Sequence, residues 1–200
     1  MTNHLVFFNP RLFYFGDPCC NLSSKQNMKY IKQSARLFLF LFALLSLPGF
    51  SQKNLASPRD SVSASLAGAV FTINYGSPAV KGRAIWGRLV PYGQVWRAGA
   101  NEATRFRISK PIKIQGKILV AGEYGLFAIP GEKQWTIIFN KVADQWGAYE
   151  YSSKEDALRV TVTPEYKEEV QEHLNYQLKD NRVIMRWEHL LIPLLIESAH

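Results

Sequence analysis

The feature that most constrains the fold is an alternation of apolar and polar residues that recurs from Ser61 onward. In the segment TRFRIS, which begins at Thr104, the two large apolar side chains point one way while Arg105 and Arg107 point the other. Such segments recur roughly every eight to twelve residues, with turn residues between them and no long amphipathic helical pattern. The sequence therefore predicts an all-β, single-domain antiparallel β-sandwich or barrel-like fold, with at most one or two short helical turns besides a signal-peptide helix.

Turn residues between these segments indicate three hairpins. The first turn lies at Ala67, and the second, GEKQ at Gly131, joins two aromatic-rich apolar runs that we expect at the centre of the core. The third lies at Asp180 and is followed by a strand and then by a last apolar strand. The segment PEYKEEV at Pro164 is expected to add one helical turn.

The N-terminal residues have the pattern of a secretory signal. From Met28, the basic segment MKYIKQSAR precedes an apolar run at residues 37–47, which is shorter than the about 20 residues of a membrane-spanning helix. Small residues follow, so we predict a signal peptide at residues 28–51 that is cleaved after Ser51. We interpret residues 1–27 as a leader translated from a start codon placed too early, with a genuine extra leader as the alternative.

Export to the periplasm or the extracellular space is the expected outcome of this signal, and it leaves a mature chain without a transmembrane segment. The 149 remaining residues (200 minus 51) are enough for one domain, which we place at residues 61–197 after a flexible lead-in at residues 52–60. The oligomeric state does not follow from the sequence.

Removal of residues 1–51 also changes the charge balance. Five of the 24 basic and one of the 16 acidic residues are lost, so 19 minus 15 leaves a net charge of +4. This mild excess is spread along the chain, unlike the basic stripe of a nucleic-acid-binding module, so no nucleic-acid partner is expected. Both cysteines, Cys19 and Cys20, lie in the leader, so the exported chain has no disulfide, thiol chemistry or cysteine metal ligand, and no cofactor is expected.

Residues 75–104, YGSPAVKGRAIWGRLVPYGQVWRAGANEAT, concentrate glycines that permit tight turns and close backbone approaches. This stretch resembles the signature of a bacterial family catalogued as domain of unknown function 2911. The resemblance continues through LVAGEYGLFAIPGEKQWTIIFNK and WGAYEY to DALRVTV, and covers roughly residues 57–197. It implies an exported single-domain protein without an established activity. The residues that carry the motif are Pro78, Lys81, Gly82, Arg83, Gly87, Pro91, Gly93, Trp96, Arg97, Gly99, Asn101, Glu102 and Thr104.

Five residues of this stretch are candidates for a ligand-binding site: Lys81, Arg83, Arg97, Asn101 and Glu102. The planar guanidinium group offers a fork of donors to carboxylates, phosphates or sugar hydroxyls. Two interpretations stay open. Either Arg97 and Glu102 form an internal ion pair that braces the turn at Asn101, or these groups form the walls of a pocket for a small-molecule, glycan or peptide ligand.

No catalytic motif appears in the sequence, and neither catalytic nor metal-binding residues are assigned. Glu102 with Asp156 or Glu150 is the carboxylate pair that glycoside hydrolysis would require. His173 and His189 have no metal ligand at suitable spacing. An envelope binding or structural module is therefore the favoured function, and a secreted hydrolase acting on glycans is the alternative.

Aromatic residues fall into two groups. Those in apolar alternation are predicted to fill the core: Trp96, Trp135 and Trp187. Trp146, Tyr149 and Tyr151 lie in a glycine-containing loop and are predicted to be exposed, where aromatic faces can stack on sugars.

Overall fold

The structure is a computed structural model that describes residues 56–199. These residues lie in one compact unit, Lys53–His200, and form two antiparallel sheets that pack on each other, which confirms the predicted all-β sandwich. One 3₁₀ turn, η1 (Ser153–Glu155), interrupts the strands. The predicted leader, signal peptide and most of the lead-in lie outside the described residues. Among the residues that are described, no helix is long and apolar enough to cross a membrane.

The larger sheet has six strands in the order β1-β2-β3-β6-β7-β8. Two of the predicted hairpins are confirmed in it, because β1 pairs with β2 across Ala67 and β6 pairs with β7 across Gly131. The strands are β1 (Arg59–Leu66), β2 (Ala69–Gly76), β3 (Thr104–Ile108), β6 (Gly122–Ile129), β7 (Trp135–Asn140) and β8 (Asp156–Val162).

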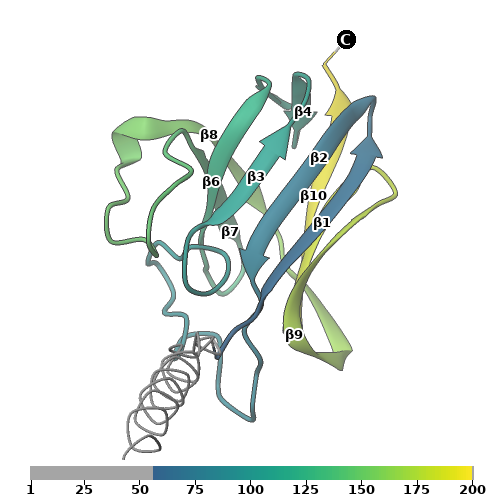
Figure 1. Cartoon of the computed structure of the whole chain (residues 1–200). Helices are drawn as coiled ribbons and strands as arrows, with labels where there is room; N and C mark the ends of the chain where they lie inside the picture. Colours follow the sequence, from purple (N-terminus) through teal and green to yellow (C-terminus); the bar gives the residue numbers. More distant parts are fainter. Residues whose placement is uncertain (1–55, 200) are drawn as a thin grey trace, which may run out of the picture. The chain divides into compact units, whose positions relative to one another are not determined.

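The smaller sheet has the order β5-β4-β10-β9 and lies behind β1 and β2 in the view of Figure 1. Its strands are β4 (Ile112–Ile114), β5 (Lys117–Leu119), β9 (Glu165–Lys179) and β10 (Arg182–Ser198). The turn predicted at Asp180 is confirmed, and both Asp180 and Asn181 have positive φ, as a two-residue hairpin turn requires.

Two sequence expectations about this sheet are wrong. The segment at Pro164 forms no helical turn but leads into β9, because Glu165 and Tyr166 pair with β10, which satisfies the backbone in an extended conformation. The last apolar strand is not separate either. It continues β10 beyond pairing irregularities around Glu188, so one strand runs from Arg182 to Ser198.

Tryptophans occupy the core, as predicted for Trp96, Trp135 and Trp187, which are all buried. Residues 77–103, which connect β2 to β3, insert Trp86 and Trp96 among the strand residues. The ring centroids of Trp86 and Trp135 lie 4.8 Å apart, and Trp96 stacks on Trp187 at 5.9 Å. Although this glycine-rich connection is irregular, it therefore contributes side chains to the core.

A second, smaller apolar cluster lies on the opposite face of β6 and β7, around Phe127 and Ile138. The loop between β7 and β8, residues 141–152, packs over it through Ala148 and Tyr151. Tyr151 is thus half-buried instead of exposed as predicted, because its ring lies against Phe127 at 5.2 Å and its hydroxyl donates to Asp156 at 2.8 Å.

Candidate functional site

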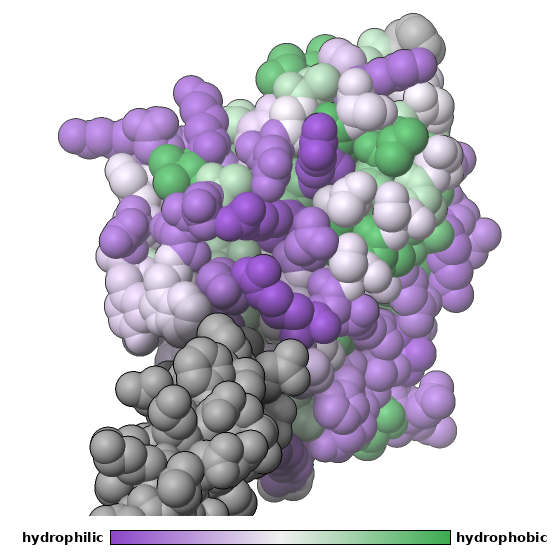
Figure 2. Space-filling model, in the orientation of Figure 1, coloured by the Kyte–Doolittle hydropathy of each residue, from purple (hydrophilic) through white to green (hydrophobic). Residues whose placement is uncertain are grey.

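A polar cleft of about 440 Å³ lies on the solvent face of the six-stranded sheet. It is formed by side chains of β1, β2, β3 and β6 together with residues just before β3, and Figure 2 shows a hydrophilic band across this face. Polar and charged side chains make up most of its lining: Arg59, Ser61, Asn74, Glu102, Arg105 and Glu123. We call this site the polar cleft.

Strand register brings these side chains together from distant parts of the sequence. Ser61 of β1 lies opposite Asn74 of β2, which lies opposite Arg105 of β3. Directly paired residues project from the same face of a sheet, so the three side chains form a row across the solvent face. The opposite face of the same strands carries buried residues such as Phe106, which anchor the row on the core.

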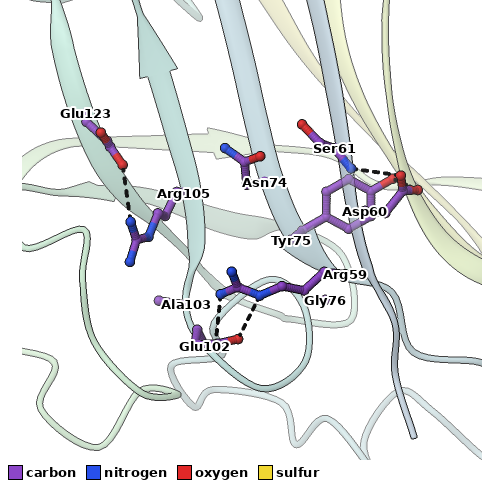
Figure 3. A pocket seen from close by; sticks show the side chains of 10 residues that line it. All are labelled: Arg59, Asp60, Ser61, Asn74, Tyr75, Gly76, Glu102, Ala103, Arg105 and Glu123. Atoms are coloured by element: carbon purple, nitrogen blue, oxygen red, sulfur yellow. Dashed lines mark hydrogen bonds and ion pairs between the residues drawn. The ribbon is translucent and has the colours of Figure 1, made fainter. Parts of the chain in front are cut away.

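Two arginines of the polar cleft hold carboxylates. Arg59 contacts both carboxylate oxygens of Glu102, with N···O distances of 2.9 and 3.3 Å. Arg105 lies 3.8 Å from Glu123 and also pairs with Asp144 of the β7–β8 loop. Figure 3 shows the Arg59–Glu102 and Arg105–Glu123 contacts at separate positions in the cleft. The cleft therefore presents fixed donors and acceptors of both signs.

Glu102 has a pKa below its ordinary value. A hydrogen bond from its own backbone N–H is the largest cause, and the hydrogen bond and positive charge of Arg59 act in the same direction. The carboxylate is consequently ionised at neutral pH. It can accept hydrogen bonds from a ligand, and it is unsuited to donate a proton as a general acid.

Of the five residues predicted from the sequence, only Glu102 lines the polar cleft. Arg83 turns back on its own loop and donates to the carbonyl oxygens of Val80, at 3.0 Å, and Ala79. Lys81 is exposed, and its backbone N–H donates to Glu172 of β9.

Asn101 also makes a structural contact, since its amide donates to the carbonyl oxygen of Ser57 at 3.0 Å. Among the described residues, no hydrogen bond or ion pair joins any two of the five candidates. Their role in ligand binding stays a prediction.

The expected ion pair between Arg97 and Glu102 is wrong, because Glu102 pairs with Arg59 instead. The backbone takes positive φ at Ala98 and Asn101, and the Thr104 N–H donates to the Arg97 carbonyl at 3.3 Å. This reversal separates the two side chains. The Arg97 side chain lies beside Gly147 instead, and its Nε is buried without an acceptor in the described part of the chain.

Neither candidate carboxylate pair shares a cavity. Asp156 lies at the start of β8, where it accepts hydrogen bonds from Asn140, Tyr151 and Arg159, and it lines a different hollow from Glu102. Glu150 is exposed and does not line the polar cleft. Within residues 56–199, no group of three or more His, Cys, Asp or Glu residues is placed to hold a metal ion.

Sequence reasoning missed Arg59, Asn74, Arg105 and Glu123 as site residues. The sequence did indicate that Arg105 is accessible, since its strand was expected to have one solvent-exposed face. The hairpin at Ala67 also fixes Asn74 opposite Ser61 by register. The order of strands was not predicted. β6 lies beside β3 because the intervening strands, β4 and β5, belong to the other sheet.

Fold and site together define a β-sandwich protein with a solvent-open polar cleft on the outer face of its larger sheet. The chain belongs to the family described as "Protein of unknown function (DUF2911)", whose model matches residues 57–196. This match confirms the resemblance seen in residues 75–104 and beyond. Comparison with curated proteins and with solved structures gave no match.

Proposed function

We propose that this is an exported, non-catalytic envelope protein that binds a small polar ligand in the polar cleft. The observation that carries the proposal is the row of side chains across β1, β2 and β3 together with Arg59, since both arginines of the cleft are already oriented by carboxylates. Groups held in place before a ligand arrives lose less conformational entropy on binding, which raises affinity. A cleft of about 440 Å³ also falls within the usual range of ligand sites, about 300–1,000 Å³.

A purely structural role explains this cluster less well. The side chains of Arg59 and Glu102 are 61% and 32% exposed, and Asp144 is 86% exposed. Exposed ion pairs of this kind contribute about 0–1 kcal/mol each to stability. Their contribution to folding is therefore small, whereas their position on a concave face suits a binding role.

Binding is favoured over glycan hydrolysis because of the state of Glu102. Hydrolysis needs one carboxyl group that holds its proton near neutral pH, typically through a raised pKa. The pKa of Glu102 is lowered, and the carboxylates paired with it on sequence grounds lie outside the cleft. A general acid for this site is thus not supplied by either pair.

Export is supported by the basic segment and apolar run in residues 28–51. N-terminal mass mapping of the secreted fraction is expected to find a chain that begins at Gln52. A chain that keeps Met1 and stays inside the cell would contradict export.

Paired arginine variants test the binding site. Arg105 and Arg107 lie two positions apart on β3, so both side chains project from the solvent face, but only Arg105 lines the cleft. In equilibrium titrations with small sugars, peptides and organic acids, Arg105→Ala is expected to weaken binding by about tenfold, equal to about 1.4 kcal/mol. Arg107→Ala is expected to bind like the wild type. Equal effects of both variants, or no binding by any panel member, would contradict the proposal.

A further inference from the structure

We infer that the ligand of the polar cleft is a neutral saccharide, which stacks on the exposed indole ring of Trp146. This inference rests on the proposed binding function and names its ligand class. Trp146 is 57% exposed and Tyr149 is 85% exposed, and both belong to the β7–β8 loop. Large aromatic side chains left open to solvent on one short loop suit a stacking surface, since their burial in a core would otherwise stabilise the fold.

Backbone pairing places Trp146 next to the polar cleft. Glu102 and Trp146 form an isolated antiparallel bridge. The Ala103 N–H donates to the Gln145 carbonyl at 3.0 Å, and the Gly147 N–H donates to the Asn101 carbonyl at 3.1 Å. This pattern makes Glu102 and Trp146 a non-hydrogen-bonded pair, whose Cα atoms lie about 4.5 Å apart and whose side chains share one face. The indole therefore stands on the same side as the carboxylate that lines the cleft.

A second contact joins the same loop to the cleft. Asp144 of this loop pairs with Arg105, and both Arg105 and the nearby Ala103 line the cleft. The loop thus borders the cleft at both Asp144 and Trp146. A ligand seated on the polar side chains meets the aromatic loop at this border.

The loop is held in place at its ends and its middle. Asn140 is fully buried and donates to the Ser152 carbonyl at 2.9 Å and to Asp156 at 2.8 Å, so it ties together the two ends of the loop. In the middle, Gln145 is buried and donates to the Val142 carbonyl at 2.8 Å. The exposed rings are therefore carried on a loop that binding does not have to order.

Gly147 brings Tyr149 and Arg97 to the same place. A Cβ atom at Gly147 would lie 3.1 Å from the Tyr149 ring and 3.5 Å from a terminal nitrogen of Arg97, so both side chains lie against this glycine. Its φ of +67° is also one that other residues adopt only with strain. Arg97, a candidate from the sequence, thus lies beside this glycine and does not line the polar cleft.

Charge pairing favours a neutral ligand. Every charged side chain that lines the cleft has a partner: Arg59 with Glu102, Arg105 with Glu123 and Asp144, and Asp60 with the hydroxyl of Tyr75. A phosphate or a carboxylate ligand would be repelled by the carboxylates that already lie beside these arginines. Sugar hydroxyls both donate and accept, so they can add to the free lone pairs and N–H groups, while the C–H face of the sugar covers an aromatic ring.

Tryptophan fluorescence of the full chain gives a direct test. Trp146 is the exposed tryptophan of the five, whereas Trp96, Trp135 and Trp187 are buried and Trp86 is half-buried. The probes are soluble di- to hexasaccharides of glucose, xylose and N-acetylglucosamine. At least one is expected to protect the emission from acrylamide, and Trp146→Ala is expected to weaken its binding by about tenfold or more in calorimetric titrations.

Tyr166→Ala is the matched control, because Tyr166 is 66% exposed on β9 of the other sheet. It is expected to leave saccharide affinity unchanged, and Trp146→Phe is expected to keep most of it. Saccharide binding that depends on Arg105 but not on Trp146 would overturn the stacking inference and leave the cleft proposal standing. The same holds if only peptides or organic acids bind in an Arg105-dependent way. If no probe of any class binds, both are wrong.

Discussion

At the scale of single residues, the two arginine candidates from residues 75–104 have different environments. Arg83 is held by carbonyl oxygens of its own turn, whereas the buried Nε of Arg97 has no acceptor among the described residues. Glu102, expected to hold Arg97, holds Arg59. These motif residues are close in the sequence, but they lie in separate environments and do not form one site.

Stability measurements distinguish these environments. Arg97→Ala is expected to change the free energy of unfolding by less than about 1 kcal/mol, because no ion pair is broken and no buried carboxylate is left alone. Arg83→Ala removes two hydrogen bonds to carbonyl oxygens and is expected to cost about 1–2 kcal/mol. Chemical denaturation of both variants provides the comparison. A loss of about 3–5 kcal/mol for Arg97→Ala would instead show that Arg97 has a buried charge partner.

The pH dependence of ligand binding follows from Glu102. Its folded-state pKa is lowered, so its pairing with Arg59 persists above the ordinary glutamate value and is lost as the pH falls through the lowered value. Among residues 56–199, no histidine lines the cleft. Saccharide affinity in calorimetric titrations is thus expected to be flat between about pH 6 and pH 8 and to fall only in acid. A midpoint near neutrality would contradict the assignment of Glu102.

At the scale of elements, tight hairpins could be predicted because their signals are local. Ala67 and Asp180 lie at turns, and the strands beside them alternate with the period of two that a half-buried strand requires. The connection over residues 77–103 could not be derived in this way. Its position depends on contacts with distant residues, such as Trp96 with Ala128 and Val80 with Glu172, and on tryptophans that pack between strands of both sheets.

The same limit applies to the candidate site. Exposure of Trp146 and Tyr149 was predicted correctly from their glycine-containing loop. The position of Trp146 opposite Glu102 was not predicted, because these two residues are far apart in the sequence and only the folded backbone brings them together. Charge partners such as Arg59 for Glu102 likewise depend on the order of strands in the sheet.

The packing of the tryptophan cluster determines how substitutions of Trp135 are expected to change stability. Trp135 on β7 is fully buried, and Trp135→Ala is expected to destabilise the domain by about 3–5 kcal/mol, the usual cost of emptying an aromatic core site. Trp135→Phe is expected to cost less, because the indole N–H has no acceptor among the described residues. Thermal melts compare the two, with the exposed Trp146→Ala as control. A melt of Trp135→Ala within a degree or two of wild type would show that β7 is not central to the core.

At the scale of the whole described unit, the two sheets enclose the core and leave the outer face of β1, β2, β3 and β6 to solvent. The β7–β8 loop covers only the part of that face around Phe127 and Ile138. The polar cleft lies in the uncovered part, and the β7–β8 loop stands at its border. The sandwich thus acts as a rigid support for a site built from strand side chains and one anchored loop.

Amide chemical shifts measured during titration with the tightest-binding saccharide of the panel locate the binding site residue by residue. The shifted amides are expected to gather at Asn74, Arg105 and Trp146, with their strand and loop neighbours, and those of β9 are expected to stay unchanged. Shifts centred on the β9–β10 sheet, or none at saturating saccharide, would contradict a binding site in the polar cleft.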